Sequence, residues 1–164
     1  MSIRRKIKNA MKRVNAIMDS NKIKSGRKEI NFDTVTLSIS HARSDVEEYE
    51  LLKTENGARA SFYEGFWRYK EDVDREDCLQ KRVEGGKELY DEICGILRDC
   101  EVVSWDGFNK GNRHALDGSS FIFNAMINGN EIYASGENNY PRKFRDFISA
   151  VKALLDREKD NDEK

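Results

Sequence analysis

Cysteine pairs and long apolar runs are missing from this sequence, and both absences exclude classes of protein. The three cysteines, at positions 78, 94 and 100, are an odd number without a CxxC spacing, so we expect reduced thiols rather than a disulfide framework. The basic N-terminus has no apolar stretch longer than Ala16–Met18, which is too short for the core of a signal peptide or for a membrane span. We therefore predict a cytoplasmic protein, and membrane binding is disfavoured.

Histidine is equally scarce, which limits hydrolytic and zinc chemistry. The chain has only His41 and His114, it has no Gly-x-Ser-x-Gly elbow, and it has neither an HExxH motif nor paired cysteines. A triad of Ser119 or Ser120 with His114 and Asp117 would have no diagnostic spacing. We predict no catalytic residue and no metal ligand, and we lean towards a protein that is not an enzyme.

Phosphate and calcium motifs each lack residues that they require. Gly85-Gly86-Lys87 resembles the end of a P-loop, but Lys81 stands where the first glycine belongs. The acidic turn that begins at Asp72 has Asp77 at the glycine position of an EF-hand loop and Val83 at the position of its last glutamate. No cofactor is predicted.

What the sequence does contain is enough apolar material for one core. Of 164 residues, 38% are hydrophobic, including eight Phe, six Tyr and two Trp, so the chain can bury a core although 36% of its residues are charged. This length fits a single domain of roughly 100 to 200 residues. We expect one folded domain with a very polar surface.

Charge is divided unevenly along the chain. Residues 1–28 hold ten Lys or Arg and one acid, a net charge of +9, while the other 136 residues hold 19 basic and 29 acidic groups, a net charge of −10. Within the basic part, apolar residues recur at helical spacing at Ile3, Ile7, Met11, Val14 and Met18. We predict a basic amphipathic helix over residues 1–24, a single domain over 29–156 and a charged tail over 157–164.

The centre of the chain reads as strands. Alternating apolar and polar residues indicate strands over 29–40, 46–53, 58–69, 121–128 and 131–135, with a further short strand over 78–83. Asn56-Gly57 predicts a hairpin turn of type I′, and Asn128-Gly129-Asn130 predicts a second hairpin turn. Strands joined by tight turns favour a mostly antiparallel sheet.

Two further helices are predicted after the fourth strand. Leu89, Tyr90, Ile93, Ile96 and Leu97 recur at helical spacing and indicate a helix over 87–99. A second apolar stripe, from Phe144 to Leu155, follows Pro141, which we expect at the first helical position. The resulting fold class is α+β, with about five to six mostly antiparallel strands and helices packed on one face, plus the N-terminal helix.

Residues with special backbone roles are concentrated between Val102 and Pro141. The strings SWDGF (104–108), LDGSSF (116–121) and ASGENNYP (134–141) resemble those of an uncharacterised family of small bacterial proteins, mainly from Firmicutes. The resemblance covers roughly residues 30 to 155, implies a shared fold and brings no activity with it. From their chemistry alone, Asp106-Gly107 and Asp117-Gly118 are expected to form turns, with Trp105 and Phe108 filling the core.

Three functions follow as hypotheses. The first is a non-enzymatic domain that binds another protein, in the manner of an immunity protein or an inhibitor, because catalytic motifs are missing and the body is acidic. The second is binding of nucleic acid through the basic N-terminal helix. The third is an enzyme with a pocket between loops 104–117 and 136–141. The candidate ligand or partner residues are Trp105, Asp106, His114, Asp117, Asn138, Arg4, Arg5, Lys8 and Lys12.

Overall fold

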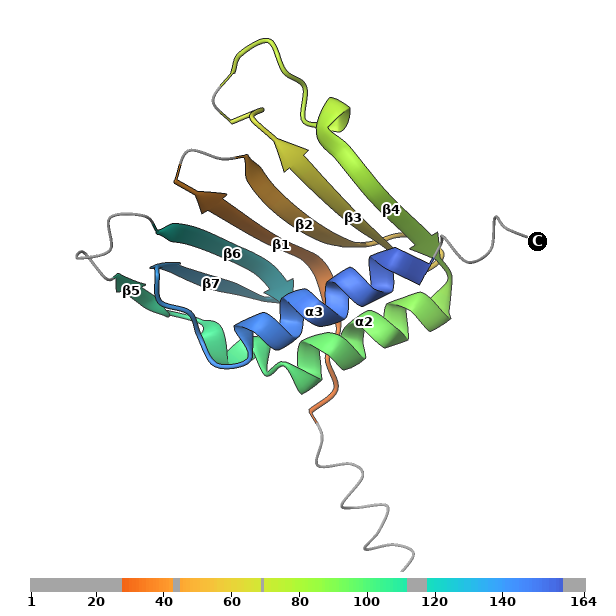
Figure 1. The fold of residues 1–164 in the computed structure, drawn as a ribbon. Coiled ribbons are helices and arrows are strands. Elements are labelled where there is room, and N and C mark those ends of the chain that lie inside the picture. Colours follow the sequence, from red (N-terminus) through yellow and green to blue (C-terminus); the bar gives the residue numbers. More distant parts are fainter. Residues whose placement is uncertain (1–27, 43–44, 69, 112–117, 158–164) are drawn as a thin grey trace, which may run out of the picture.

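A seven-stranded sheet with two helices on one face makes up the domain (Figure 1). The computed structural model describes residues 28–42, 45–68, 70–111 and 118–157. The predicted N-terminal helix and charged tail lie outside these residues. The elements follow one another as β1 (Phe32–His41), β2 (Val46–Lys53), β3 (Ala58–Gly65), β4 (Leu79–Gly85), α2 (Lys87–Asp99), β5 (Asn109–Gly111), β6 (Ser119–Ile127), β7 (Asn130–Glu137) and α3 (Phe144–Asp156).

The sheet has the strand order β4-β3-β2-β1-β6-β7-β5. All neighbouring strands are antiparallel except β5, whose three residues pair in parallel with β7. The long central strand β1 carries its apolar residues Val35, Leu37 and Ile39 on one face. Its register places Leu37 opposite Tyr49 of β2 and Phe123 of β6, so these three strands supply the middle of the core.

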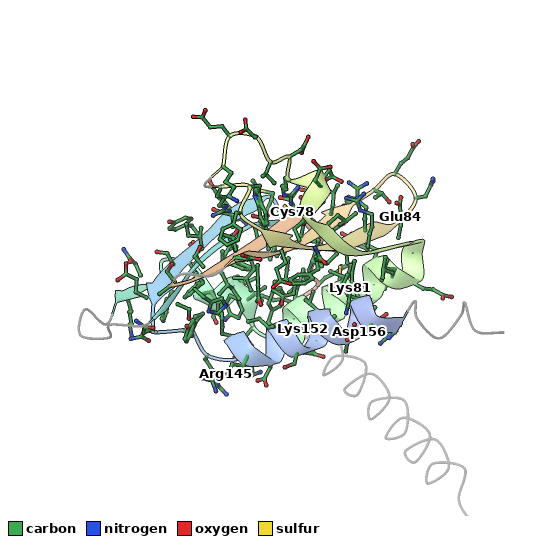
Figure 2. The ribbon with its side chains drawn as sticks, turned by 45° about the horizontal axis from the view of Figure 1, so that its top comes forward. Cys78, Lys81, Glu84, Arg145, Lys152 and Asp156 are labelled. Carbon is green, nitrogen blue, oxygen red and sulfur yellow. The ribbon has the colours of Figure 1, made fainter. Side chains whose placement is uncertain are left out.

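Helices α2 and α3 cover this apolar face with amphipathic stripes (Figure 1). Figure 2 shows Lys81 of β4 near Asp156 at the end of α3, and the two side chains form an ion pair there. The core includes the indole of Trp105, which is 1% exposed and packs against Phe123 and Phe147 with ring centroids 5.0 and 5.6 Å apart. The α+β class and the largely antiparallel sheet are therefore confirmed.

Several local expectations were wrong. The predicted strand over 58–69 ends at Gly65, and the described residues between β3 and β4 form an irregular connection that ends in a 3-10 helix, Glu76–Cys78. The predicted loop over 104–117 contains the end of a second 3-10 helix, Val102–Trp105, and the short parallel strand β5, so the sheet has seven strands rather than five or six. Helix 87–99 was predicted to the residue.

The two Asn-Gly pairs behave differently. Asn128 and Gly129 have φ values of +52° and +74°, as a type I′ turn requires. Neither Asn56 nor Gly57 has a positive φ, so the first turn is not of this type. Gly57 is required there for another reason, because a Cβ on it would overlap the backbone of Gly85 and Gly86.

The start of α3 also differs from the expectation. Pro141 is not the first helical residue, because Lys143 takes a φ of +62° and the helix begins at Phe144. The left-handed turn at Lys143 lets its ammonium group reach the carbonyl oxygen of Asp99 at 2.8 Å. Among the described residues, no helix is long and apolar enough to cross a membrane.

Candidate interaction surface

The sheet face opposite the helices is the open face, and strand register determines which side chains lie on it. Successive residues of a strand point to opposite faces, so the partners of the core residues point away from the helices. On β1 the open face carries hydroxyl side chains only, from Thr34, Thr36, Ser38 and Ser40. Thr and Ser suit a sheet face that is partly covered and partly open to solvent, because their hydroxyl groups can form hydrogen bonds with neighbouring side chains or with water.

One half of the open face is closed by an ionic network from the β3–β4 connection. The carboxylate of Glu48 on β2 is 6% exposed, and it accepts hydrogen bonds from Ser38 Oγ at 2.7 Å, from Arg68 Nη2 at 2.9 Å and from Arg75 Nε at 2.8 Å. Arg75 also bonds to Glu50 at 2.9 Å. Every donor is charged or hydroxylic, which is how a buried carboxylate is stabilised.

The same network continues onto β3 and β4. The Arg75 guanidinium lies 3.9 Å from the centroid of the Tyr63 ring, and the Tyr63 hydroxyl donates to Glu76 at 3.0 Å. Arg82 reaches Tyr63 at 2.8 Å and Glu76 at 3.1 Å. The Tyr63 hydrogen bond, with help from Arg82, lowers the pKa of Glu76 below its ordinary range. Three carboxylates thus balance three guanidinium groups over this half.

Among the described residues no such cover lies over the other half, on β1, β6, β7 and β5, and we call it the uncovered half. Ile122 of β6 and Tyr133 of β7 point outward there and are 40% and 46% exposed. Register places Asn124 opposite Tyr133 and Ser135 opposite Ile122, so the two exposed apolar side chains are diagonal neighbours. Two large apolar side chains that share one sheet face form a small apolar patch rather than two isolated contacts with water.

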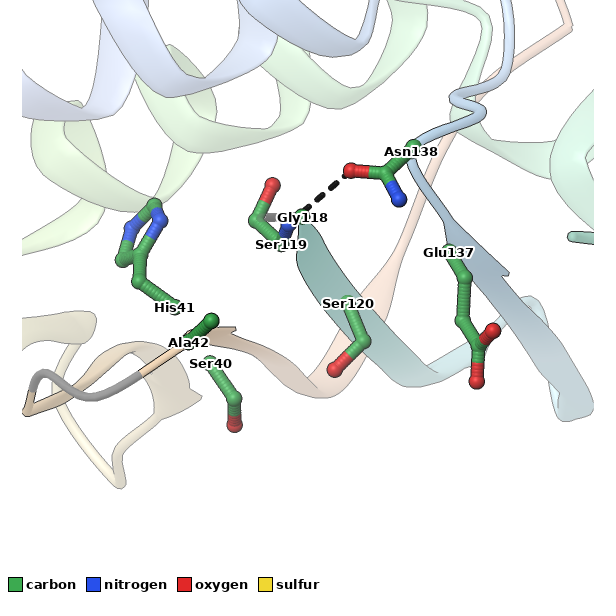
Figure 3. Close-up of a pocket in the computed structure, with 8 residues that line it drawn as sticks. All are labelled: Ser40, His41, Ala42, Gly118, Ser119, Ser120, Glu137 and Asn138. Carbon is green, nitrogen blue, oxygen red and sulfur yellow. Dashed lines mark hydrogen bonds between the residues drawn. The ribbon is translucent and has the colours of Figure 1, made fainter. Parts of the chain in front are cut away.

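Two shallow hollows lie on this half and share Ser120 and Glu137, and Ile122 and Tyr133 line the larger of the two. The larger, of about 650 Å³, lies along β5, β6 and β7 beside Asn109 and Lys110. The smaller, of about 340 Å³, lies at the ends of β1, β6 and β7 (Figure 3). In this view Ser40, Ser120 and Glu137 point away from the helices, whereas His41 points towards them. The lining groups are mostly hydroxyls, amides and one carboxylate.

Charge on the uncovered half is acidic. Strands β1, β6 and β7 contain no lysine or arginine, although such residues make up 29 of the 164 in the chain. Their carboxylates are Asp33, Glu131 and Glu137, all exposed. The ammonium group of Lys110 on β5 lies 5.6 Å from the centroid of the Phe108 ring. Asp33 lies 3.8 Å from Lys53 of β2, so the carboxylates on the strands of the patch itself are Glu131 and Glu137, and Lys110 lines the larger hollow with Glu137.

The residues predicted as a ligand or partner site are not brought together in the described residues. Trp105 lies in the core, where its indole N–H donates to the carbonyl oxygen of Arg142 at 2.9 Å. A carboxylate oxygen of Asp106 accepts the backbone N–H of Tyr133 at 3.1 Å, which holds the loop against β7. Both side chains are therefore used to build the fold.

Asn138 is the predicted site residue that lies beside a hollow. Its φ is +51°, and its side-chain oxygen accepts the backbone N–H of Ser119 at 3.0 Å (Figure 3). Its own N–H donates to the carbonyl oxygen of Ser119 at 2.9 Å, so both groups close the end of the β6–β7 pair. His114, Asp117, Arg4, Arg5, Lys8 and Lys12 lie outside the described residues, and their roles stay predictions.

The sequence analysis did not single out Ile122, Tyr133 or the network around Glu48. The signal for the first pair was present, because Ile122 occupies the polar side of the alternation from Phe121 to Ile127. An apolar residue on the polar side of a strand is a sign of a second contact surface. The Glu48 network has no such signal, because its arginines come from an irregular connection.

Known proteins add no further constraint on this surface. A comparison with protein-family models gives no match for the chain, and a comparison with curated proteins finds no significantly similar sequence.

Proposed function

We propose that this chain is a non-enzymatic binding domain that holds a basic surface of another protein on the uncovered half of its sheet, as an immunity protein or an inhibitor does. The observation that carries the proposal is the exposed pair of Ile122 and Tyr133 on strands without lysine or arginine. Interface centres are more apolar than the rest of the surface, they are enriched in aromatic residues such as tyrosine, and they are depleted in lysine.

Charge favours a basic partner. The body from residue 29 onward carries a net charge of −10, and the arginines of the β3–β4 connection are already paired with carboxylates of the other half. Carboxylates around an apolar patch attract a basic partner over a distance and repel acidic proteins. The hollows on this face are shallow and lined mostly by polar groups, which suits a protein surface better than a small ligand, because a small ligand requires a concave and mostly apolar pocket.

A crosslinking experiment tests the proposal. A photoreactive phenylalanine replaces Tyr133 in one variant and Phe66, which is 39% exposed in the β3–β4 connection, in the control. We expect the Tyr133 variant to crosslink a basic protein in the native host that the Phe66 variant does not. Crosslinking alone does not suffice, so the captured protein is then purified and its affinity measured by calorimetry.

Matched substitutions then test whether the captured protein binds to the uncovered half. Ile122→Arg should weaken binding by about 100-fold or more, because it puts an unpaired charge into the centre of the interface. Phe66→Arg adds the same charge outside the uncovered half and should change the affinity by less than about threefold. If Ile122→Arg binds as tightly as the unchanged protein, or if the captured protein is acidic, the proposal is wrong.

The two other hypotheses stay predictions. Nucleic-acid binding rests on residues 1–28, most of which lie outside the described part of the chain, and it predicts an affinity that falls steeply with salt. An enzyme site between loops 104–117 and 136–141 would need convergent polar groups. Asp106 is not available for it, since its carboxylate is bonded to the Tyr133 N–H.

A further inference from the structure

A hollow with an apolar floor lies at the end of the domain where the described chain begins. It is formed between the end of α2, the 3-10 helix Val102–Trp105 and the nearby ends of β1, β6 and β7, and it has a volume of about 500 Å³. Four aliphatic side chains form its floor: Ile30, Leu97, Ile127 and Ile132. We call this hollow the end groove. The lining of the two hollows beside the open face is, by contrast, mostly polar.

The edge of the end groove is also apolar. Val103 lines it and is 46% exposed, the same fraction as Tyr133. Val103 lies next to Val102, which is fully buried, so the 3-10 helix turns one valine into the core and the other towards the groove. An exposed aliphatic side chain beside an apolar hollow marks a surface that gains free energy when another apolar group covers it.

The chain itself supplies an apolar segment close to this groove. Lys28, the first described residue, lines the groove, and ten positions separate it from Met18. A stretch of that length spans at most about 35 Å, so the segment before it can reach any part of the groove. In that segment Ile3, Ile7, Met11, Val14 and Met18 are spaced to form one stripe of a helix.

Charge around the end groove is mixed, and its unpaired carboxylates complement this segment. The charged lining residues are Lys28, Arg98 and Glu101, and the exposed residues Glu29, Asp99 and Glu131 are sequence neighbours of lining residues. Glu101 pairs with Lys143 at 3.2 Å and Asp99 with Arg98 at 3.9 Å, whereas Glu29 and Glu131 have no ion pair among the described residues. Residues 1–28 carry a net charge of +9, and Arg4, Arg5, Lys8 and Lys12 fall beside the apolar stripe rather than in it.

We propose that residues 3–18 bind as an amphipathic helix in the end groove of their own chain, with the apolar stripe against Val103 and the floor. The short connection makes the contact intramolecular, with an effective concentration on the order of millimolar, so even a weak contact is populated. Bound in this way, the basic side chains lie against the carboxylates of the body. An anionic partner would have to compete for them. The end groove shares no lining residue with the two hollows of the uncovered half, so this proposal is tested independently of the proposed function.

Hydrogen exchange of the full chain tests the contact. The backbone amides of residues 3–18 should exchange about tenfold more slowly in the unchanged protein than in Ile7→Ser/Met11→Ser, because that double variant removes two aliphatic side chains from the stripe. Asn9→Ser/Asn15→Ser is the matched control, with two serines placed outside the stripe, and it should exchange like the unchanged protein. Both pairs lie outside the strands and helices that the structure describes, so circular dichroism of the two variants checks that the domain stays folded.

The groove side is tested in the same way. Val103→Asp should abolish the protection of residues 3–18, whereas Ile122→Asp, at a similarly exposed aliphatic residue on the open face, should leave it intact. Equal exchange in the unchanged protein and in Ile7→Ser/Met11→Ser would overturn the proposal. So would a protection that increases with protein concentration, because the segment would then bind a second copy rather than its own chain.

Discussion

The carboxylate of Glu48 and the guanidinium of Arg75 form an ion pair with 2.6 Å between Oε1 and Nη2, although the side chain of Glu48 is only 6% exposed. Arg75 lies in an irregular connection, 27 residues further along the chain. The pair therefore joins the β3–β4 connection to the centre of the sheet. Because Glu48 also holds Ser38 and Arg68, its removal affects the whole network.

Glu48→Gln should lower the free energy of unfolding by about 2 kcal/mol, because it removes the charge that compensates two arginines. The value stays below that of a fully buried pair because the arginine side chains are 30% and 38% exposed. Glu50→Gln, on the same strand and face, is the control and should cost below about 1 kcal/mol. Urea denaturation at constant m-value measures both. If Glu48→Gln and Glu50→Gln lowered the free energy of unfolding equally, Glu48 would not be the residue that holds the network together.

Trp105→Phe should lower the free energy of unfolding by about 2 kcal/mol. The smaller phenyl ring fills less of the core, and the Arg142 carbonyl oxygen loses the hydrogen bond from the indole N–H. Trp67 is the natural control, since it is only partly buried and contacts Tyr63 at a ring-centroid distance of 6.4 Å. Trp67→Phe should cost less than about 1 kcal/mol. Thermal unfolding followed by circular dichroism distinguishes the two, and a larger loss for Trp67 would show that the core is centred elsewhere.

Gly118 and Asn138 form a tight contact at the end of the β6–β7 pair. A Cβ on Gly118 would overlap the carboxamide of Asn138, which holds the Ser119 N–H. Gly118→Ala should therefore destabilise the domain by about 2 kcal/mol. Gly111→Ala is the control, because its nearest neighbours are atoms of the Glu137 side chain at 3.8 and 4.0 Å, and it should be within about 0.5 kcal/mol of neutral.

A double variant checks the cause of that loss. If the carboxamide is the obstacle, Gly118→Ala combined with Asn138→Ala should be less destabilised than the sum of the two single variants, since the second change removes the atoms that the new methyl group meets. Strict additivity in urea denaturation would mean that Gly118 is required for another reason.

Sequence patterns predicted the features of this fold that depend on neighbouring residues in the sequence, and they missed features that depend on distant residues. Helix 87–99 and the Asn128-Gly129 turn are determined by neighbours in sequence, and both were predicted. Asn56-Gly57 has the same letters, but its shape is set by the approach of Gly85 and Gly86 from β4 and α2. No local pattern carries that information.

The candidate surface shows the same limit. Alternation predicted a polar side for β1, but it could not show which half of that side the β3–β4 connection would cover. That outcome depends on Arg68 and Arg75 reaching Glu48 over 20 and 27 residues. The strand β5 and its parallel pairing could not be predicted either, because a three-residue strand has too few side chains for a periodic signal.

Alkaline pH should destabilise the domain through its buried thiols. Burial raises the pKa of Cys94 and of Cys100 above the ordinary value of 9.0, and burial likewise raises the pKa of Tyr90 above 10.0. Above pH 9 the unfolded chain therefore releases protons that the folded chain still holds. The stabilisation is complete below the unfolded-state pKa and is lost as pH rises through the folded-state pKa.

Urea denaturation at pH 7, 9 and 10 should accordingly show a free energy of unfolding that falls above pH 9. The decline should be shallower in Cys94→Ala/Cys100→Ala, whose remaining pH dependence comes from tyrosines such as Tyr90. Both cysteines are buried, so a thiol reagent at pH 8 should modify them far more slowly in the folded protein than after unfolding. A pH dependence that is unchanged in the double variant would show that the two thiols do not cause the alkaline loss.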